Sequence, residues 1–320
     1  MPNIRQPRHG SMQYWPRKRA RRAYPRVRSW QSLEQSKPLG FAGYKVGMTH
    51  IIVTDNWKFS KTKGEQISLP VTIIECPPLK VASIRLYRQG LSGLQVADEI
   101  FAKPDKELAR KIPEPKKQKT ADNIDVSNYV DVRLNVYTQP KLTGIGKKKP
   151  EIFEIALGGK IADKLELAKS LLGKEILIRD VFKEGQQVDI HAVTKGKGYQ
   201  GPVKRFGVAI RSHKSEKTKR GPGSLGGWRG QAHVMYRVSH AGQMGYHTRT
   251  EWNKQIIKIG EKDDINRGGG FDNYGIIRNS YLLVKGSVQG AKKRLVRLCL
   301  ATRKNKKIAE DAPSIEYLHK

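Results

Sequence analysis

The sequence is poor in acidic residues. Only 29 of its 320 residues are Asp or Glu, against 62 Lys or Arg, so the formal net charge is +33 with histidine neutral. A compact protein with that charge repels itself and requires a polyanionic partner, of which a phosphate backbone is the commonest. The composition therefore favours nucleic acid over a small-molecule substrate.

Cysteine and membrane signals are equally scarce. Cys76 and Cys299, the only cysteines, lie in apolar runs, which is typical of buried reduced thiols in a cytoplasmic protein rather than of disulfides or metal sites. No apolar run approaches the length of a membrane span, and we find neither an amphipathic basic helix nor a lipidation signal. We therefore expect no membrane partner.

Catalytic patterns are absent as well, with no P-loop and no serine nucleophile elbow. Gly196–Gly201 matches the dinucleotide fingerprint G-x-G-x-x-G, but Pro202 and Val203 follow where an amphipathic helix should begin. We therefore expect no enzyme and no cofactor. Glycine instead lets backbone amides approach phosphate closely, and three lysines border these glycines: Lys195, Lys197 and Lys204.

The charges are segregated along the chain. Residues 1–30 contain nine Lys or Arg and no acid, and residues 195–254 contain 13 bases, two acids and 11 glycines. Residues 98–185, in contrast, hold 15 acids against 18 bases, whereas residues 273–309 again carry no acid. Such segregation predicts that some segments lie against phosphate while one faces water.

Short alternating runs predict a mainly β protein with an α+β insertion. Strands are expected at 130–136, 188–192, 256–259, 282–284 and 295–300, as parts of a barrel or sandwich. In the charge-balanced segment, helices are expected over 161–172, with Gly173 as the stop, and from Pro104 to Ile112. The predicted segments are a basic N-terminal extension (1–40), a discontinuous β domain (41–77, 179–194 and 255–300), the insertion (78–178), a basic glycine-rich central extension (195–254) and a C-terminal tail (301–320).

Aromatic residues are interleaved with arginine near the N-terminus. The run Pro16–Arg22 carries five bases, and four aromatic residues surround it: Tyr14, Trp15, Tyr24 and Trp30. Arginine binds phosphate oxygens bidentately, and aromatic rings stack on exposed bases. A nuclear-import signal would also explain the bases, but it has no use for the rings. Without a partner, we expect residues 1–30 and about 210–235 to be disordered and protease-sensitive.

The central basic segment holds four of the eight histidines. His233, His240 and His247 recur every seven residues, with His213 nearby, but no acid or cysteine stands at metal-ligand spacing, so no metal site is expected. Glycines surround Trp228, which favours a base-stacking wedge at a loop tip over a ring that caps its own loop. The alternative function is an RNA-processing or RNA-modifying enzyme that uses this histidine-rich loop.

Five motifs together resemble the ribosomal protein L3 family of the large subunit: Gly43–His50, Gly196–Phe206, Ala241–Thr250, Pro7–Gly10 with Pro16–Arg19, and Gly286–Arg294. The resemblance covers nearly the whole chain in order. The long N-terminal arm and the insertion are similar to the archaeal and eukaryotic branch, and the length favours the archaeal one. Eukaryotic relatives place a modifiable histidine in a Lys-Thr-His-Arg-Gly stretch; Lys219 stands there in this chain, so no histidine modification is expected at that position.

The resemblance implies a translation-protein-type β-barrel with a basic arm and a central loop extension. It implies direct binding to large-subunit rRNA near its 3′ end, an early role in subunit assembly, and an extension that reaches toward the peptidyl-transferase centre with Trp228 at its tip. It also implies a cytoplasmic ribosomal location, with ribosomal protein L14 among the neighbours.

The residues expected to contact RNA are the cationic, amide and aromatic side chains of the arm and the central extension. They are Arg8, His9, Arg17, Lys18, Arg19, Arg21, Arg22, Lys195, Lys197, Lys204, Arg205, His213, Lys217, Lys219, Arg220, Trp228, Arg229, His233, His240, Gln243, His247 and Arg249.

Overall fold

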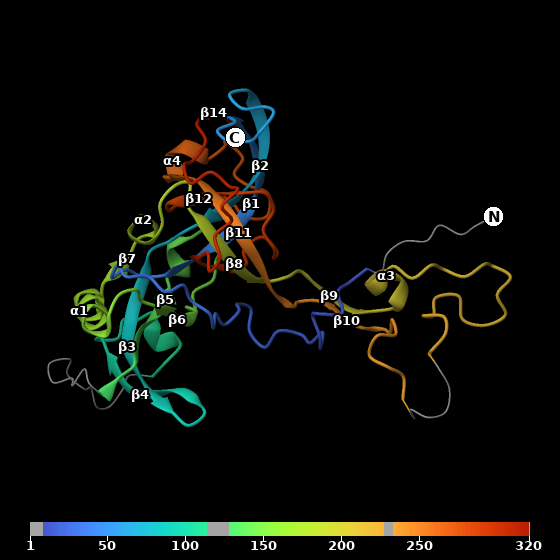
Figure 1. The fold of residues 1–320 in the computed structure, drawn as a ribbon, viewed down its shortest axis with the longest axis horizontal. Helices are drawn as coiled ribbons and strands as arrows, with labels where there is room; N and C mark the ends of the chain where they lie inside the picture. The colour runs from blue at the N-terminus through green and yellow to red at the C-terminus, as the bar shows by residue number, and fades with distance from the viewer. Residues whose placement is uncertain (1–8, 114–127, 227–232, 320) are drawn as a thin grey trace. The chain divides into compact units, whose positions relative to one another are not determined.

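The computed structural model describes residues 9–113, 128–226 and 233–319 (Figure 1). The protein is mainly β, as predicted, and its helices are few and short. It divides into two compact units. The basic unit comprises Met1–Arg22 and Val193–Thr248, and the main unit comprises Ala23–Ala192 and Arg249–Lys320.

Seven strands form the larger sheet of the main unit, in the order β13-β8-β11-β12-β2-β1-β14. They are β1 (Gly40–Thr54), β2 (Gln66–Glu75), β8 (Gln187–Val193), β11 (Thr248–Gly260), β12 (Tyr281–Lys285), β13 (Leu295–Leu300) and β14 (Ile315–Leu318). β1 also pairs with β13, from Gly40 opposite Cys299 to Tyr44 opposite Leu295. Each of six strands (β13, β8, β11, β12, β2 and β1) therefore has a partner on both edges. Together these six strands form a closed ring of paired strands.

β14 lies within the segment that we expected to be a C-terminal tail. It pairs with β1 at Ile51–Val53, and its apolar residues Ile315 and Leu318 pack against the core. Burial of these two side chains offsets the entropy lost when the segment is ordered. The tail is therefore partly a strand of the main unit.

The chain between β2 and β8 forms a second sheet in the order β4-β3-β5-β6, with β7 beside β3. These strands are β3 (Leu79–Gly90), β4 (Gly93–Phe101), β5 (Asp131–Thr138), β6 (Ile152–Ala156) and β7 (Glu175–Ile176). Helix α1 (Ile161–Leu171) packs against β3 and β5. Gly173 follows it with a φ of 75°, the left-handed conformation that ends many helices. The predicted helix at 161–172 is thus confirmed.

Among the elements that lie wholly within the described residues, the other short helices of the main unit are η1 (Leu108–Arg110), η3 (Pro140–Leu142), α2 (Ile178–Val181) and α4 (Lys262–Ile265). The helix predicted from Pro104 to Ile112 is wrong in extent, since only the single turn η1 forms there. Leu108 is buried as expected, but Pro113 disfavours helical backbone at the residue before it and so limits the turn.

The two sheets share one hydrophobic core. Buried Phe41 and Leu298 of the larger sheet belong to the same cluster as Ile84 and Leu134 of the smaller one. Both cysteines are buried and free, as predicted, and burial raises the pKa of the Cys299 thiol to about 12.

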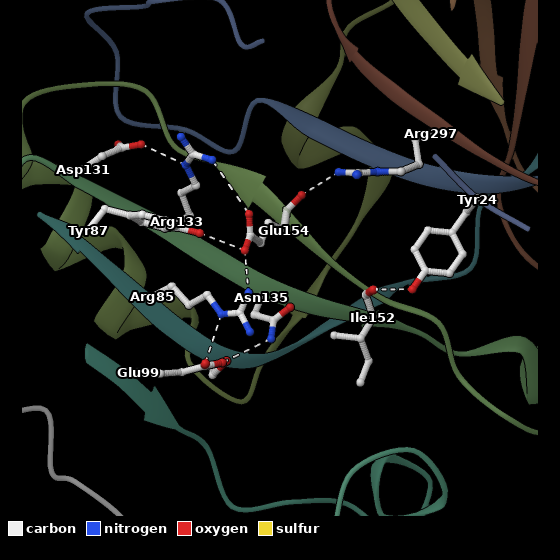
Figure 2. Close-up of polar contacts among 11 residues, drawn as sticks. Tyr24, Arg85, Tyr87, Glu99, Asp131, Arg133, Asn135, Ile152, Glu154 and Arg297 are labelled. Carbon is white, nitrogen blue, oxygen red and sulfur yellow. Dashed lines mark hydrogen bonds and ion pairs between the residues drawn. The ribbon is translucent and has the colours of Figure 1, made fainter. Parts of the chain in front are cut away.

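Part of the segment 23–30 packs against this core, which corrects the expectation that the first thirty residues all lack structure without a partner. Val27 is buried, and Tyr24 and Trp30 pack against the core. The Tyr24 hydroxyl donates to the Ile152 carbonyl at 2.8 Å (Figure 2). Tyr24 and Trp30 are therefore structural side chains, whereas we had expected them to stack on bases.

A buried arginine joins this segment to both sheets. Arg297 of β13 donates to the carbonyl oxygen of Pro25 at 3.3 Å. It also donates to the carbonyl oxygen of Glu154 on β6 at 2.5 Å (Figure 2). Its guanidinium lies 4.4 Å from the centroid of the Phe153 ring. Burial lowers the pKa of Arg297 to about 10, so the group is still a cation at neutral pH. One side chain thus links the N-terminal segment, β6 and β13.

Ion pairs match cations with carboxylates on the smaller sheet (Figure 2). Arg85 lies 3.0 Å from the Glu99 carboxylate and 2.5 Å from the Glu154 carboxylate, and Arg133 lies 2.9 Å from the Asp131 carboxylate. Because these cations are matched by acids of the same sheet, this face does not require an external polyanion.

Glu75, the last residue of β2, is a fully buried carboxylate held by four donors. It accepts hydrogen bonds from the Tyr274 hydroxyl, from the Arg278 N–H at 2.9 Å, and from the Asn279 N–H and side-chain amide at 3.1 and 2.8 Å. These bonds fix the chain that leads into β12.

Replacing Glu75 with alanine is expected to lower the free energy of unfolding by about 3 kcal/mol, because buried donors would lose their acceptor. Chemical denaturation of the free protein measures this. The control Glu65→Ala, at an exposed position, should change the stability by less than about 0.5 kcal/mol. A Glu75→Ala effect as small as the control's would contradict the structural role of this carboxylate.

Candidate nucleic-acid interface

The basic unit is built on a two-stranded antiparallel sheet of β9 (Gly196–Gln200) and β10 (Gly242–Gly245). Their register shifts between Gln243 and Gly245. Gly245 has a φ of 70°, and a Cβ there would lie 2.0 Å from the Lys195 carbonyl oxygen. Only glycine fits such a close approach at a positive φ.

A one-turn helix follows β9. Helix α3 (Pro202–Phe206) has proline in its first turn and ends at Gly207, which has a φ of 67°. We expected no helix after the glycine-rich stretch, so α3 is a correction. Proline is tolerated in a first turn because the N–H that it lacks has no intrahelical partner there.

Arg205 of α3 fixes the chain that enters β10. Its Nε donates to the Gln243 carbonyl at 3.1 Å, and its Nη1 donates to the His240 carbonyl at 2.8 Å. Burial lowers the pKa of this guanidinium. The Gln243 amide donates in turn to the Gly245 carbonyl at 2.9 Å. Arg205 and Gln243, both expected at the RNA surface, thus donate hydrogen bonds to backbone carbonyls of the basic unit.

The N-terminal arm lies along this sheet. The Ala20 N–H donates to the Tyr246 carbonyl at 2.8 Å. The Nδ1 atom of His247 lies 2.9 Å from the Lys18 carbonyl oxygen, and its backbone N–H donates to the Thr194 hydroxyl at 3.1 Å. His247 is only 8% exposed. Its ring is therefore an anchor for the arm.

Two arginines of the arm lie over aromatic rings of the same unit. The Arg17 guanidinium carbon is 4.4 Å from the centroid of Phe206, and that of Arg19 is 5.4 Å from the centroid of Tyr246. Such cation–π contacts add to the docking of the arm. Trp15 is about half exposed and lies beside Tyr236, with ring centroids 5.5 Å apart.

Most of the residues expected to contact RNA are exposed. These are His9, Lys18, Arg19, Arg21, Arg22, Lys195, Lys197, Lys204, His213, Lys217, Lys219, Arg220, His233 and His240. Arg17, Arg205, Gln243 and Arg249 are half-buried. Arg8, Trp228 and Arg229 lie outside the described residues. Residues 193–248 hold 11 bases and one acid, Glu216, so the charge of this segment is not matched within it.

One pair of exposed aromatic side chains was not predicted from the sequence. Trp57 and Phe59, in the loop between β1 and β2, both stand on the surface of the main unit. The alternation of aromatic residues and lysine over 57–63 was the signal that could have revealed them. Over the described ranges, no three side chains of metal-ligating type gather at one place, and no helix is both long and apolar enough to cross a bilayer.

Exposed cations on a glycine-rich backbone are the electrostatic footprint of a nucleic-acid-binding protein.

The chain belongs to the family described as Ribosomal protein L3, whose model matches residues 1–318. It is similar to the Large ribosomal subunit protein uL3 of Methanothermobacter thermautotrophicus, with 47% identity over 98% of this chain and 96% of that protein. The protein of the same description from Archaeoglobus fulgidus is 46% identical, over 91% of this chain and 90% of its own length. The protein is thus a ribosomal protein and not an enzyme, and the alternative of an RNA-modifying enzyme is set aside.

His247→Ala is expected to loosen the arm, because the Lys18 carbonyl loses its partner. The loss of about 1–2 kcal/mol in local stability corresponds to about five- to thirtyfold faster cleavage. Limited trypsin digestion of the free protein, read by mass spectrometry, should show this increase after Arg17 and Arg19.

His213→Ala, at an exposed ring, is the matched control and should leave cleavage of the arm unchanged. Equal arm cleavage in wild-type protein and His247→Ala would show that the ring does not anchor the arm.

Proposed function

We propose that the protein is a structural constituent of the large ribosomal subunit that binds large-subunit rRNA directly through the basic unit. The observation that carries this proposal is that 14 of the residues expected to contact RNA, all cationic or histidine side chains of the arm and the central extension, are exposed. The near full-length similarity to proteins described as large ribosomal subunit proteins supports it.

The physical driving force is the release of counterions from RNA phosphates by lysine and arginine. Exposed side chains such as Lys197, Lys217 and Arg220 supply these contacts. Arg17, Arg205, Gln243 and His247 act indirectly, because they hold the arm and β10 in the shape that presents the cations. An interface that is ordered before binding loses less entropy when RNA arrives.

The finer assignments follow from the resemblance to the family. The closed order of six strands is proposed to be the translation-protein-type β-barrel, with residues 1–22 of the N-terminal extension and the central extension (195–254) as its basic appendages. We assign the protein to an early step of subunit assembly and to rRNA near its 3′ end. The central extension points toward the peptidyl-transferase centre, and ribosomal protein L14 is a neighbour.

Affinity for large-subunit rRNA should fall steeply with salt. For each phosphate contacted, the logarithm of the association constant should fall by about 0.7–0.9 for every tenfold rise in salt concentration. Replacing Lys217, Lys219 and Arg220 together with alanine should flatten this slope by roughly two to three, since three contacts are removed. Filter binding over about 50–200 mM salt measures both slopes.

The matched control replaces Lys148 and Lys149, two exposed lysines of the main unit, and should leave the slope nearly unchanged. Binding that does not respond to salt, or an equal change in both variants, would refute counterion release by the basic unit.

Trp228→Ala is expected to yield assembled subunits with altered peptidyl transfer or tRNA binding, since alanine cannot stack on a base. Trp228→Phe keeps a stacking ring and should behave nearly as wild type. Subunits that carry Trp228→Ala with both normal translation and an unchanged rRNA footprint would reject the role of this tip residue.

A further inference from the structure

The loop between β1 and β2 presents two large aromatic side chains to solvent. Phe59 is 75% exposed and Trp57 is 41% exposed. Three exposed lysines share the loop with them: Lys58, Lys61 and Lys63. We call residues 55–65 the aromatic loop. It belongs to the main unit, whereas the cations of the proposed interface lie mostly in the basic unit.

The aromatic loop is ordered by its own hydrogen bonds. The Asp55 carboxylate accepts from the Trp57 N–H at 3.0 Å and from the Thr62 hydroxyl at 2.8 Å. Two backbone bonds close its base, from the Asp55 N–H to the Glu65 carbonyl at 3.0 Å and from the Gly64 N–H to the Asp55 carbonyl at 2.9 Å. The rings therefore stand on a preformed support, which lowers the entropic cost of binding.

A second anchor ties the loop to the C-terminal part of the chain. The Asn56 side-chain amide donates to the Asp311 carbonyl at 3.0 Å. Asp311 precedes β14, which pairs with the end of β1. The loop is thus held at its base from two sides, while its aromatic residues remain outside the core cluster.

The charges within the aromatic loop favour nucleic acid over a protein partner. The Lys58 ammonium lies 5.9 Å from the centroid of the Phe59 ring, so a base stacked on that ring would bring its phosphate near a cation. The Asp55 carboxylate is occupied within the loop, and Glu65 at the base is the only other acid of the segment. Aromatic platforms flanked by cations are the usual means by which proteins hold unpaired bases.

We propose that the aromatic loop is a second RNA-contact site, where Phe59 and Trp57 stack on unpaired bases of large-subunit rRNA and the three lysines neutralise the adjoining phosphates. The proposal rests on the proposed function, since it takes rRNA as the ligand. The site selects single-stranded or bulged RNA with little base preference, because every base offers a π face.

Directed cleavage from the loop tests this site. Both native cysteines are buried, so Lys61→Cys provides the one accessible thiol for a tethered hydroxyl-radical reagent. In the complex of the full chain with large-subunit rRNA, we expect cuts in one unpaired RNA stretch. Lys148→Cys, at an exposed position away from the loop in sequence, is the matched control and should not cut that stretch.

Substitutions of Phe59 in the Lys61→Cys protein distinguish stacking from simple apolar contact. Phe59→Ala should weaken cutting of that stretch about tenfold, the loss expected for one stacked base. Phe59→Tyr keeps the ring and should cut as before, whereas Phe59→Leu should resemble alanine. If leucine preserved the cutting, the contact would be apolar, as with a protein partner, and the stacking site would be overturned.

The total affinity for rRNA, measured on the same samples, separates this proposal from the proposed function. Normal rRNA binding without cuts from Lys61→Cys, or with cuts only in paired RNA, would overturn the aromatic loop as a site and leave the function standing. Loss of all rRNA binding in wild-type protein would instead overturn both.

Discussion

Positive charge without matching acids is the constraint on which the rest of this structure depends. In the main unit, cations such as Arg85 and Arg133 are paired with carboxylates of the same sheet. In the basic unit, residues 193–248 carry 11 bases and a single acid. Charges of one sign repel one another unless a polyanion lies between them. The partner is therefore implied by the chain's own electrostatics.

Internal contacts shape the basic unit before any partner is bound. Gly245 allows the close approach of β10 to the Lys195 carbonyl, and Arg205 fixes the turn into β10 with two hydrogen bonds. His247 anchors the arm at Lys18. The basic unit needs few apolar residues to hold its shape, because hydrogen bonds and cation–π contacts hold its segments together. The side chains that point away from these contacts remain available for phosphate.

Local pattern was enough to predict β5, β8, β12, β13 and part of β11, as well as helix α1 and the segregated basic surface, because each depends on neighbouring residues. It did not reveal strands such as β1, β3 and β4. It failed for Tyr24 and Trp30, whose burial depends on β6 and Arg297, more than 120 positions along the chain. It failed for α3, since one turn has too short a pattern to recognise. Exposed Phe59 was missed although aromatic residues and lysine alternate over 57–63, because no strand was predicted at β1 to mark that segment as a loop.

The central claim is that the lysines of the basic unit lie against rRNA, and lysine reactivity in the free protein and in assembled large subunits tests it most directly. Acylation mapped by mass spectrometry should show strong protection in subunits of Lys195, Lys197, Lys204, Lys217 and Lys219. Lys148 and Lys149 of the main unit report the general level of protection. If the five lysines of the basic unit reacted in subunits as readily as in the free protein, the account would be contradicted.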